Sequence, residues 1–136
     1  MSLERIDARL DELEGRATAA DAAELLALSE SVLEHWVAAR GDTPTPELRE
    51  GFRLLALHRQ GCRGLPSFNA CRETCRELVY HYNLLAGAAP DEASAGRARM
   101  MVLLARHLFL FVTGKMQVEQ LGEFCCSSRP LRQDAG

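Results

Sequence analysis

The chain has 136 residues, of which 47% are apolar and 26% are charged, and these values are ordinary for one globular domain spanning 1–136. The formal net charge is −3, and no dense basic face is visible, so we do not expect nucleic acid as a partner. Residues 1–60 carry 7 basic and 12 acidic side chains. Alanine, leucine, arginine and glutamate dominate, which predicts an all-α fold.

The start of the chain and its apolar runs predict the compartment. Met1–Glu4 leads directly into an acidic amphipathic segment, so we expect no signal peptide and a cytoplasmic protein. The apolar run 100–112 is interrupted by Arg106 and His107 and is too short to span a bilayer, so we expect no membrane contact. Five cysteines without an export signal favour reduced thiols over a disulfide framework.

Apolar periodicity predicts an antiparallel bundle of four long helices and a short amphipathic helix within 1–14. The long helices are expected at about 19–40, 46–60, 66–87 and 91–113. The N-terminal segment is too short for a stable coiled coil of its own, so it must pack on the domain or on a partner. Its apolar residues, at heptad spacing, are Leu3, Ile6, Leu10 and Leu13. The tail 125–136 lacks periodicity, and we expect it to be mobile.

Capping signals and apolar stripes support the two helices of the first half. The inward stripe of the helix 19–40 consists of Leu25, Leu28, Ser29, Val32, Leu33 and Trp36. Thr45, Pro46 and Glu47 supply an N-cap, a proline at the first helical position and an early acid for the helix 46–60. The main stripe of that helix is expected to be Leu48, Phe52 and Leu55, and the helix should end at Gly61.

The central helix is expected between Pro66 and Gly87, which are typical start and stop residues of a helix. Its apolar stripe consists of Phe68, Cys71, Cys75, Leu78, Val79, Tyr82, Leu85 and Ala86. Because Cys71 and Cys75 are four residues apart on this stripe, we expect both to be buried on one face. The following helix, 91–113, is apolar nearly all round in its second half, and Gly114 is expected to interrupt it.

The same cysteines are candidate metal ligands. With Cys125 and Cys126, and with Cys62 as a fifth thiol, Cys71 and Cys75 would supply enough thiolates for zinc or an iron–sulfur cluster. The spacing does not match the paired C-x-x-C pattern of zinc knuckles. The alternative is that Cys71 and Cys75 are small buried hydrophobic residues of the core.

Two polar features have structural interpretations. The histidines fall one on each expected long helix, at His35, His58, His81 and His107, and surface or capping positions are expected for all but His107, which lies in an apolar helix. Residues 48–80 are compatible with a helix-turn-helix that presents Arg72 and Arg76. Glu73 and Glu77 share that outer face and would repel phosphates, so a part of the bundle is the better interpretation.

No nucleophile motif or phosphate-binding glycine loop is found, which favours a non-enzymatic binding or regulatory protein that acts through protein contacts, with a homodimer as the expected partner. The candidate interface residues are Leu3, Ile6, Leu10, Leu13, Phe109 and Phe111. One alternative is a metal or thiol redox protein that uses Cys71, Cys75, Cys125 and Cys126. Another is a ligand-binding bundle with a pocket lined by Tyr82, Phe109 and Phe111.

Overall fold

The computed structural model describes residues 1–119, and within this part the chain is all-α. Its α-helices are α1 (Leu3–Leu13), α2 (Ala22–Ala39), α3 (Arg53–Cys62), α4 (Asn69–Ala86) and α5 (Ser94–Val118). Short 3₁₀ helices, η1 (Ala19–Asp21) and η2 (Pro66–Phe68), precede α2 and α4. The tail 125–136, for which mobility was predicted, lies outside the described residues.

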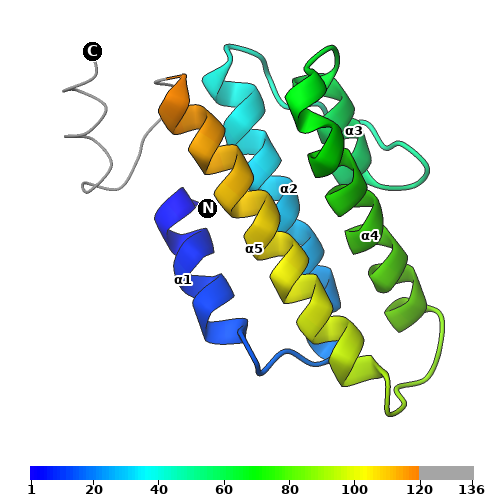
Figure 1. Ribbon diagram of the computed structural model, residues 1–136. Helices are drawn as coiled ribbons and strands as arrows, with labels where there is room; N and C mark the ends of the chain where they lie inside the picture. The colour runs from blue at the N-terminus through cyan, green and yellow to red at the C-terminus, as the bar shows by residue number, and fades with distance from the viewer. Residues whose placement is uncertain (120–136) are drawn as a thin grey trace.

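The helices form two layers, with α5 between α1 and α4 on one side and α2 behind it (Figure 1). The core contains the whole predicted stripe of α2, from Leu25 to Trp36, as well as Cys71 and Cys75 of α4, so these predictions are confirmed. The ring of Trp36 lies 4.9 Å from that of Phe68, centroid to centroid, and this pair joins α2 to the start of α4. The short helix α3 closes the bundle beside α4 at one end.

A glycine determines how closely α3 approaches α2. The indole Nε1 of Trp36 donates a hydrogen bond of 2.8 Å to the carbonyl oxygen of Gly61. A Cβ atom at Gly61 would lie 2.7 Å from Cδ1 of Trp36 and 2.9 Å from Cγ2 of Val37. Only glycine therefore allows this backbone contact. Gly61 is a packing residue inside α3, whereas the sequence had predicted the end of the helix there.

The predicted start of the third helix is wrong, because residues 46–52 are not helical. The Thr45 hydroxyl accepts a hydrogen bond from the Glu47 amide, and Gln60 Oε1 accepts one from the Thr45 amide. Glu50 has a φ of 54°, and the backbones of Arg49 and Phe52 exchange two hydrogen bonds across this turn. Leu48, predicted to be core, is consequently 65% exposed.

Helix α5 differs from its prediction in length. It continues through Gly114 to Val118, so the predicted interruption is wrong. By length and composition this helix could cross a membrane, although the shorter apolar run had suggested otherwise. Helix α5 packs against α1, α2 and α4 and buries Met101, Leu108 and Val112 among them, and core helices of soluble proteins pass the same composition test.

The predicted interface residues lie mostly inside this single chain. Ile6, Leu10 and Leu13 of α1 are buried in the common core, and Leu3 is partly buried against it. Phe109 is buried, and Phe111 packs edge-on against Phe68 with ring centroids 5.0 Å apart. A partner is therefore not needed to cover these side chains, because α2, α4 and α5 already do so.

Candidate functional site

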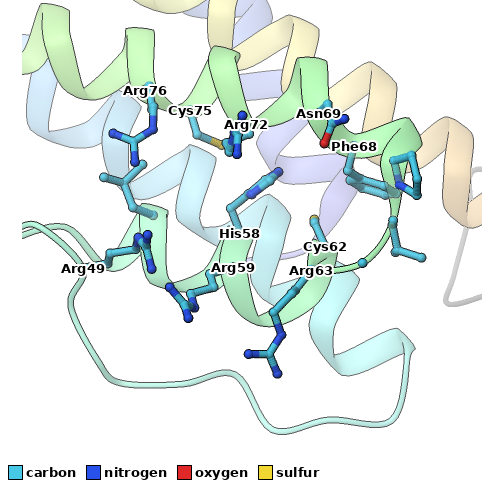
Figure 2. A pocket seen from close by; sticks show the side chains of 14 residues that line it. Arg49, His58, Arg59, Cys62, Arg63, Phe68, Asn69, Arg72, Cys75 and Arg76 are labelled. Carbon is cyan, nitrogen blue, oxygen red and sulfur yellow. The ribbon is translucent and has the colours of Figure 1, made fainter.

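A cavity of about 430 Å³ lies between α3 and α4, open to the surface beside the loop that precedes α3 (Figure 2). Five arginines line it, and no aspartate or glutamate among residues 1–119 does. They are Arg49 from the loop, Arg59 and Arg63 from α3, and Arg72 and Arg76 from α4. The remaining wall is largely apolar and includes Leu55, Leu65, Pro66 and Phe68. The volume is in the range of small-molecule sites.

The arginines differ in their acidic partners. Arg76 Nη2 lies 2.9 Å from an Oε2 atom of Glu50, and Arg49 Nε lies 3.9 Å from the same oxygen. Arg72 Nε lies 3.7 Å from Oε1 of its neighbour Glu73. Among residues 1–119, no carboxylate lies within 4 Å of the guanidinium groups of Arg59 and Arg63. The cavity therefore carries an excess of positive charge.

The hydrogen bond between Arg76 and Glu50 links α4 to the loop before α3. It lowers the pKa of the Glu50 carboxyl and raises the pKa of the Arg76 guanidinium. Because Glu50 is shared with Arg49, one carboxylate serves two cations at this end of the cavity. Both groups are solvent-exposed, so this pair orients the side chains and adds little stability.

Beneath the arginines lies a buried layer made of His58 and Cys62 from α3 and Cys71 and Cys75 from α4. His58, Cys62 and Cys75 also line the cavity. The surface position predicted for His58 is wrong, because its side chain is only 8% exposed. Helix α4 covers this face of α3, and the sequence pattern of α3 alone did not reveal that contact.

The buried thiols differ in acidity because they contact one another and His58. Cys75 and then His58 hydrogen-bond the Cys71 sulfur and lower the pKa of Cys71 to about 6, against the opposing effect of burial. The same contact with Cys71, together with burial, raises the pKa of Cys75. Burial also raises the pKa of Cys62. Within this coupled pair Cys71 is therefore the more acidic thiol, and His58 is one of the groups that favour its ionised form.

One ring nitrogen of His58 has no hydrogen-bond partner among the described residues. Its Nε2 atom is buried and accepts or donates no hydrogen bond within residues 1–119. Figure 2 shows the ring reaching from α3 toward α4, across the middle of the cavity. A buried polar atom without a partner is costly, so an unfilled hydrogen bond at this position indicates a place for a ligand or a water molecule.

A repeated sequence pattern could have identified this site. The pattern is a buried His or Cys followed directly by an exposed Arg, and the same pair of residues recurs four positions later. It occurs in the segments 58–63, HRQGCR, and 71–76, CRETCR. Residues four apart share a helix face, so each segment carries an inner pair of His or Cys and an outer pair of arginines. Sequence reasoning noted Arg72 and Arg76 but missed Arg59, Arg63 and His58 as their counterparts.

The metal site predicted at the cysteines is not observed in the described part of the chain. Within residues 1–119, no group of three or more His, Cys, Asp or Glu side chains is arranged to hold a metal ion. Cys125 and Cys126 lie outside the described residues, so a zinc or iron–sulfur site that includes them stays a prediction.

The other predicted polar and aromatic residues lie apart from the cavity. His35 contacts the carbonyl oxygen of Met1 through Nε2 at 2.6 Å, and His107 is exposed on α5. His81 is half-buried, and burial lowers its pKa. Tyr82, which was predicted to line a pocket with Phe109 and Phe111, instead contacts Phe52 edge-on at 5.8 Å. None of these three aromatic residues lines the arginine cavity.

In comparisons with known proteins, no protein-family model, curated protein or solved structure matches the chain.

Proposed function

We propose that this protein is a non-enzymatic binding protein that holds a small anionic ligand in the cavity between α3 and α4. The observation that carries the proposal is that five arginines line the cavity, whereas no carboxylate of the described residues does. This proposal is of the same kind as the ligand-binding bundle predicted from the sequence. The predicted pocket involved Tyr82, Phe109 and Phe111, whereas the cavity between α3 and α4 is lined by other residues.

The charge balance supports an anion over a neutral ligand. Like charges that converge on one cavity repel each other, and an anion that binds among them relieves this repulsion. Arg59 and Arg63 are without a carboxylate within the described residues, and Glu50 serves both Arg49 and Arg76. Guanidinium groups are planar forks that match the oxygens of phosphates and carboxylates, so arginine is the suitable residue for such a site.

The test is a calorimetric titration with pyrophosphate at low ionic strength. We expect saturable binding by the parent protein and an affinity at least tenfold lower after Arg59→Gln with Arg63→Gln. The matched control is Arg5→Gln with Arg99→Gln, which removes the same charge from two exposed arginines outside the cavity and should change the affinity less than twofold. No binding by the parent, or equal losses in both double variants, would refute the site.

A second candidate function is protein–protein contact through a homodimer, and the exposed side of α5 favours it. Leu103 and Leu110 are 54% and 60% exposed, and they share one face with Met100, which is also exposed. Together with the exposed His107, Gly96 and Gly114 complete a face with alternating spacings of four and three residues. Two antiparallel copies of α5 would place Met100 opposite Leu110, Leu103 opposite His107 and glycine opposite glycine, so each copy would present the same residues to the other.

This dimer is tested by sedimentation equilibrium at micromolar concentration. We expect a particle of twice the chain mass, and Leu103→Glu should reduce it to the single chain. Tyr80→Glu, which places the same charge at an exposed aromatic residue of α4, should leave the dimer intact. A parent protein that sediments as a single chain would remove this candidate without affecting the anion site.

A further inference from the structure

We propose that the ligand of the arginine cavity is an organic phosphate, in which a phosphate monoester dianion is joined to a compact apolar body. The phosphate would lie among the arginines and His58, and the apolar body would lie against Leu65, Pro66 and the edge of Phe68. This inference rests on the proposed anion-binding function and adds the chemical class of the ligand.

The number of uncompensated cations favours a dianion. Arg59 and Arg63 have no carboxylate within 4 Å among residues 1–119, so at least two positive charges at the cavity lack a counter-charge from a carboxylate. A monocarboxylate would neutralise only one of them. A phosphate monoester carries close to two negative charges at neutral pH and three acceptor oxygens, which suit several guanidinium groups at once.

The cavity is polarised along its length. Figure 2 shows Arg49 and Arg76 together at one end and Phe68 and Asn69 at the other, with His58 between them. Leu65 and Pro66 belong to the apolar end, where η2 begins. Free inorganic phosphate would leave this apolar wall in contact with water, whereas an apolar body attached to the phosphate would cover it.

His58 supplies a hydrogen bond that the protein itself does not use. His58 is close enough to Cys71 to lower the pKa of that thiol, and the buried Nε2 atom of the ring lacks a partner within the described residues. With a proton on Nε2, the ring would donate to a phosphate oxygen at the centre of the cavity. This unfilled bond lies between the cationic end and the apolar end, where the phosphate group and the body of the ligand would join.

A free small molecule fits this site better than a lipid in a membrane. The cavity has about 430 Å³, which suits a phosphate with a body the size of one ring. Arg5 and Arg99, the exposed arginines on other helices, do not extend the basic patch around its mouth. A membrane surface would instead be met by a broad cationic or amphipathic face.

The experiment compares three probes by calorimetry at one pH and ionic strength: inorganic phosphate, phenyl phosphate and glucose 6-phosphate. We expect phenyl phosphate to bind at least fivefold more tightly than the other two. Leu65→Ser, a change at a half-buried wall residue, should abolish this preference and leave the affinity for inorganic phosphate within twofold. Arg76→Gln should weaken all three probes together and preserve the preference.

A spectroscopic measurement on the parent protein tests the role of His58 without a variant that could fail to fold. Phenyl phosphate should shift the ¹⁵N resonance of His58 Nε2 to that of a protonated, hydrogen-bonded nitrogen. An unchanged Nε2 resonance at saturation would overturn the placement of the phosphate.

The outcomes separate this inference from the proposed function. If pyrophosphate binds through Arg59 and Arg63 but phenyl phosphate gains less than fivefold over inorganic phosphate, the ligand class is wrong and the anion site stands. If no anion binds, both the proposed anion-binding function and the inferred ligand class are wrong. Binding to vesicles of phosphatidic acid without binding of phenyl phosphate would overturn the free organic phosphate in favour of a lipid headgroup.

Discussion

Two groups of arginines in this protein have different surroundings. Arg9, Arg53 and Arg106 each contact a carboxylate on another helix: Arg9 pairs with Glu24, Arg53 with Glu34, and Arg106 with both Asp7 and Asp11. These pairs connect α1 to α2, α3 to α2 and α5 to α1. Arg59 and Arg63 contact no carboxylate of the described residues and face a cavity instead.

The distribution of acidic residues along the chain explains this difference. Residues 1–50 carry 12 of the 19 acidic side chains, whereas between Glu50 and Glu73 the chain has four arginines and no acidic residue. The carboxylates that contact arginines of the cavity belong to Glu50 and Glu73, the two residues that bound this stretch. The carboxylate pairs of Arg9, Arg53 and Arg106 join helices, whereas Arg59 and Arg63 have no such partner among the described residues.

The largest effect is expected from a substitution that displaces α3. The packing of α3 on α2 sets the positions of Arg59 and Arg63. Gly61→Val would force Cβ into the ring of Trp36, 2.7 Å away, and overpacking of this kind costs about 3 kcal/mol. We expect this loss in the free energy of unfolding, measured by chemical denaturation, together with loss of pyrophosphate binding.

The matched control for this change is Gly96→Val on α5. A Cβ atom at Gly96 would meet nothing within 4 Å, and valine has a higher helix propensity than glycine. The stability of the single chain, measured below any concentration at which it dimerises, should therefore stay the same or rise slightly, with anion binding unchanged. Equal destabilisation by both substitutions would show that Gly61 has no special packing role.

The buried pair Cys71 and Cys75 makes the free energy of unfolding depend on pH at the cavity side of the protein. The folded pKa of Cys71, about 6, lies below the ordinary value of about 8.5, so its stabilisation is complete above the ordinary value and is lost as the pH falls toward 6. The raised pKa of Cys75 acts oppositely, and its stabilisation is lost as the pH rises above the ordinary value.

The free energy of unfolding should therefore increase between pH 6 and 8.5, by about 2 kcal/mol, and decrease at higher pH. Denaturation curves at half-unit steps of pH would measure this profile. Cys71→Ser should remove the rising limb, since serine does not ionise in this range. A variant that keeps the same rise would assign it to another group.

Periodicity predicted the helices well wherever one face of a helix is buried along its whole length. The stripe of α2 and the burial of Cys71 and Cys75 follow from a spacing of three and four residues, which the core selects directly. The start of α3 could not be predicted in this way. The capping signals at Thr45–Glu47 are local, and a hydrogen bond from the Thr45 amide to Gln60, distant in sequence, satisfies the same groups outside a helix.

The cavity was missed for a related reason. A pattern shows which residues of a helix share a face, but not which helix lies opposite that face. His58 was expected at a surface or capping position, and its contact with α4 makes it a buried group beside Cys71. Only a comparison of the segments 58–63 and 71–76 shows that both helices carry the same pattern of an inner His or Cys pair and an outer Arg pair.

The smallest expected effects are the changes in the free energy of unfolding when arginines of the two groups are replaced. These changes compare the two groups directly. Arg106→Gln removes a guanidinium that contacts Asp7 and Asp11 and is largely covered, so the free energy of unfolding should fall by about 1 kcal/mol. Arg59→Gln with Arg63→Gln removes two charges that repel their neighbours, so stability without ligand should stay within about 0.5 kcal/mol or rise.

Ionic strength separates electrostatic causes from loss of packing in these variants. Added salt screens exposed pairs, so the cost of Arg106→Gln should shrink between 20 mM and 500 mM salt, and any gain in the double variant should shrink as well. Pyrophosphate should raise the melting temperature of Arg106→Gln as it does that of the parent, but not that of the double variant, because a ligand stabilises only a fold that binds it. A double variant that is clearly less stable than the parent would show that Arg59 and Arg63 serve the fold after all.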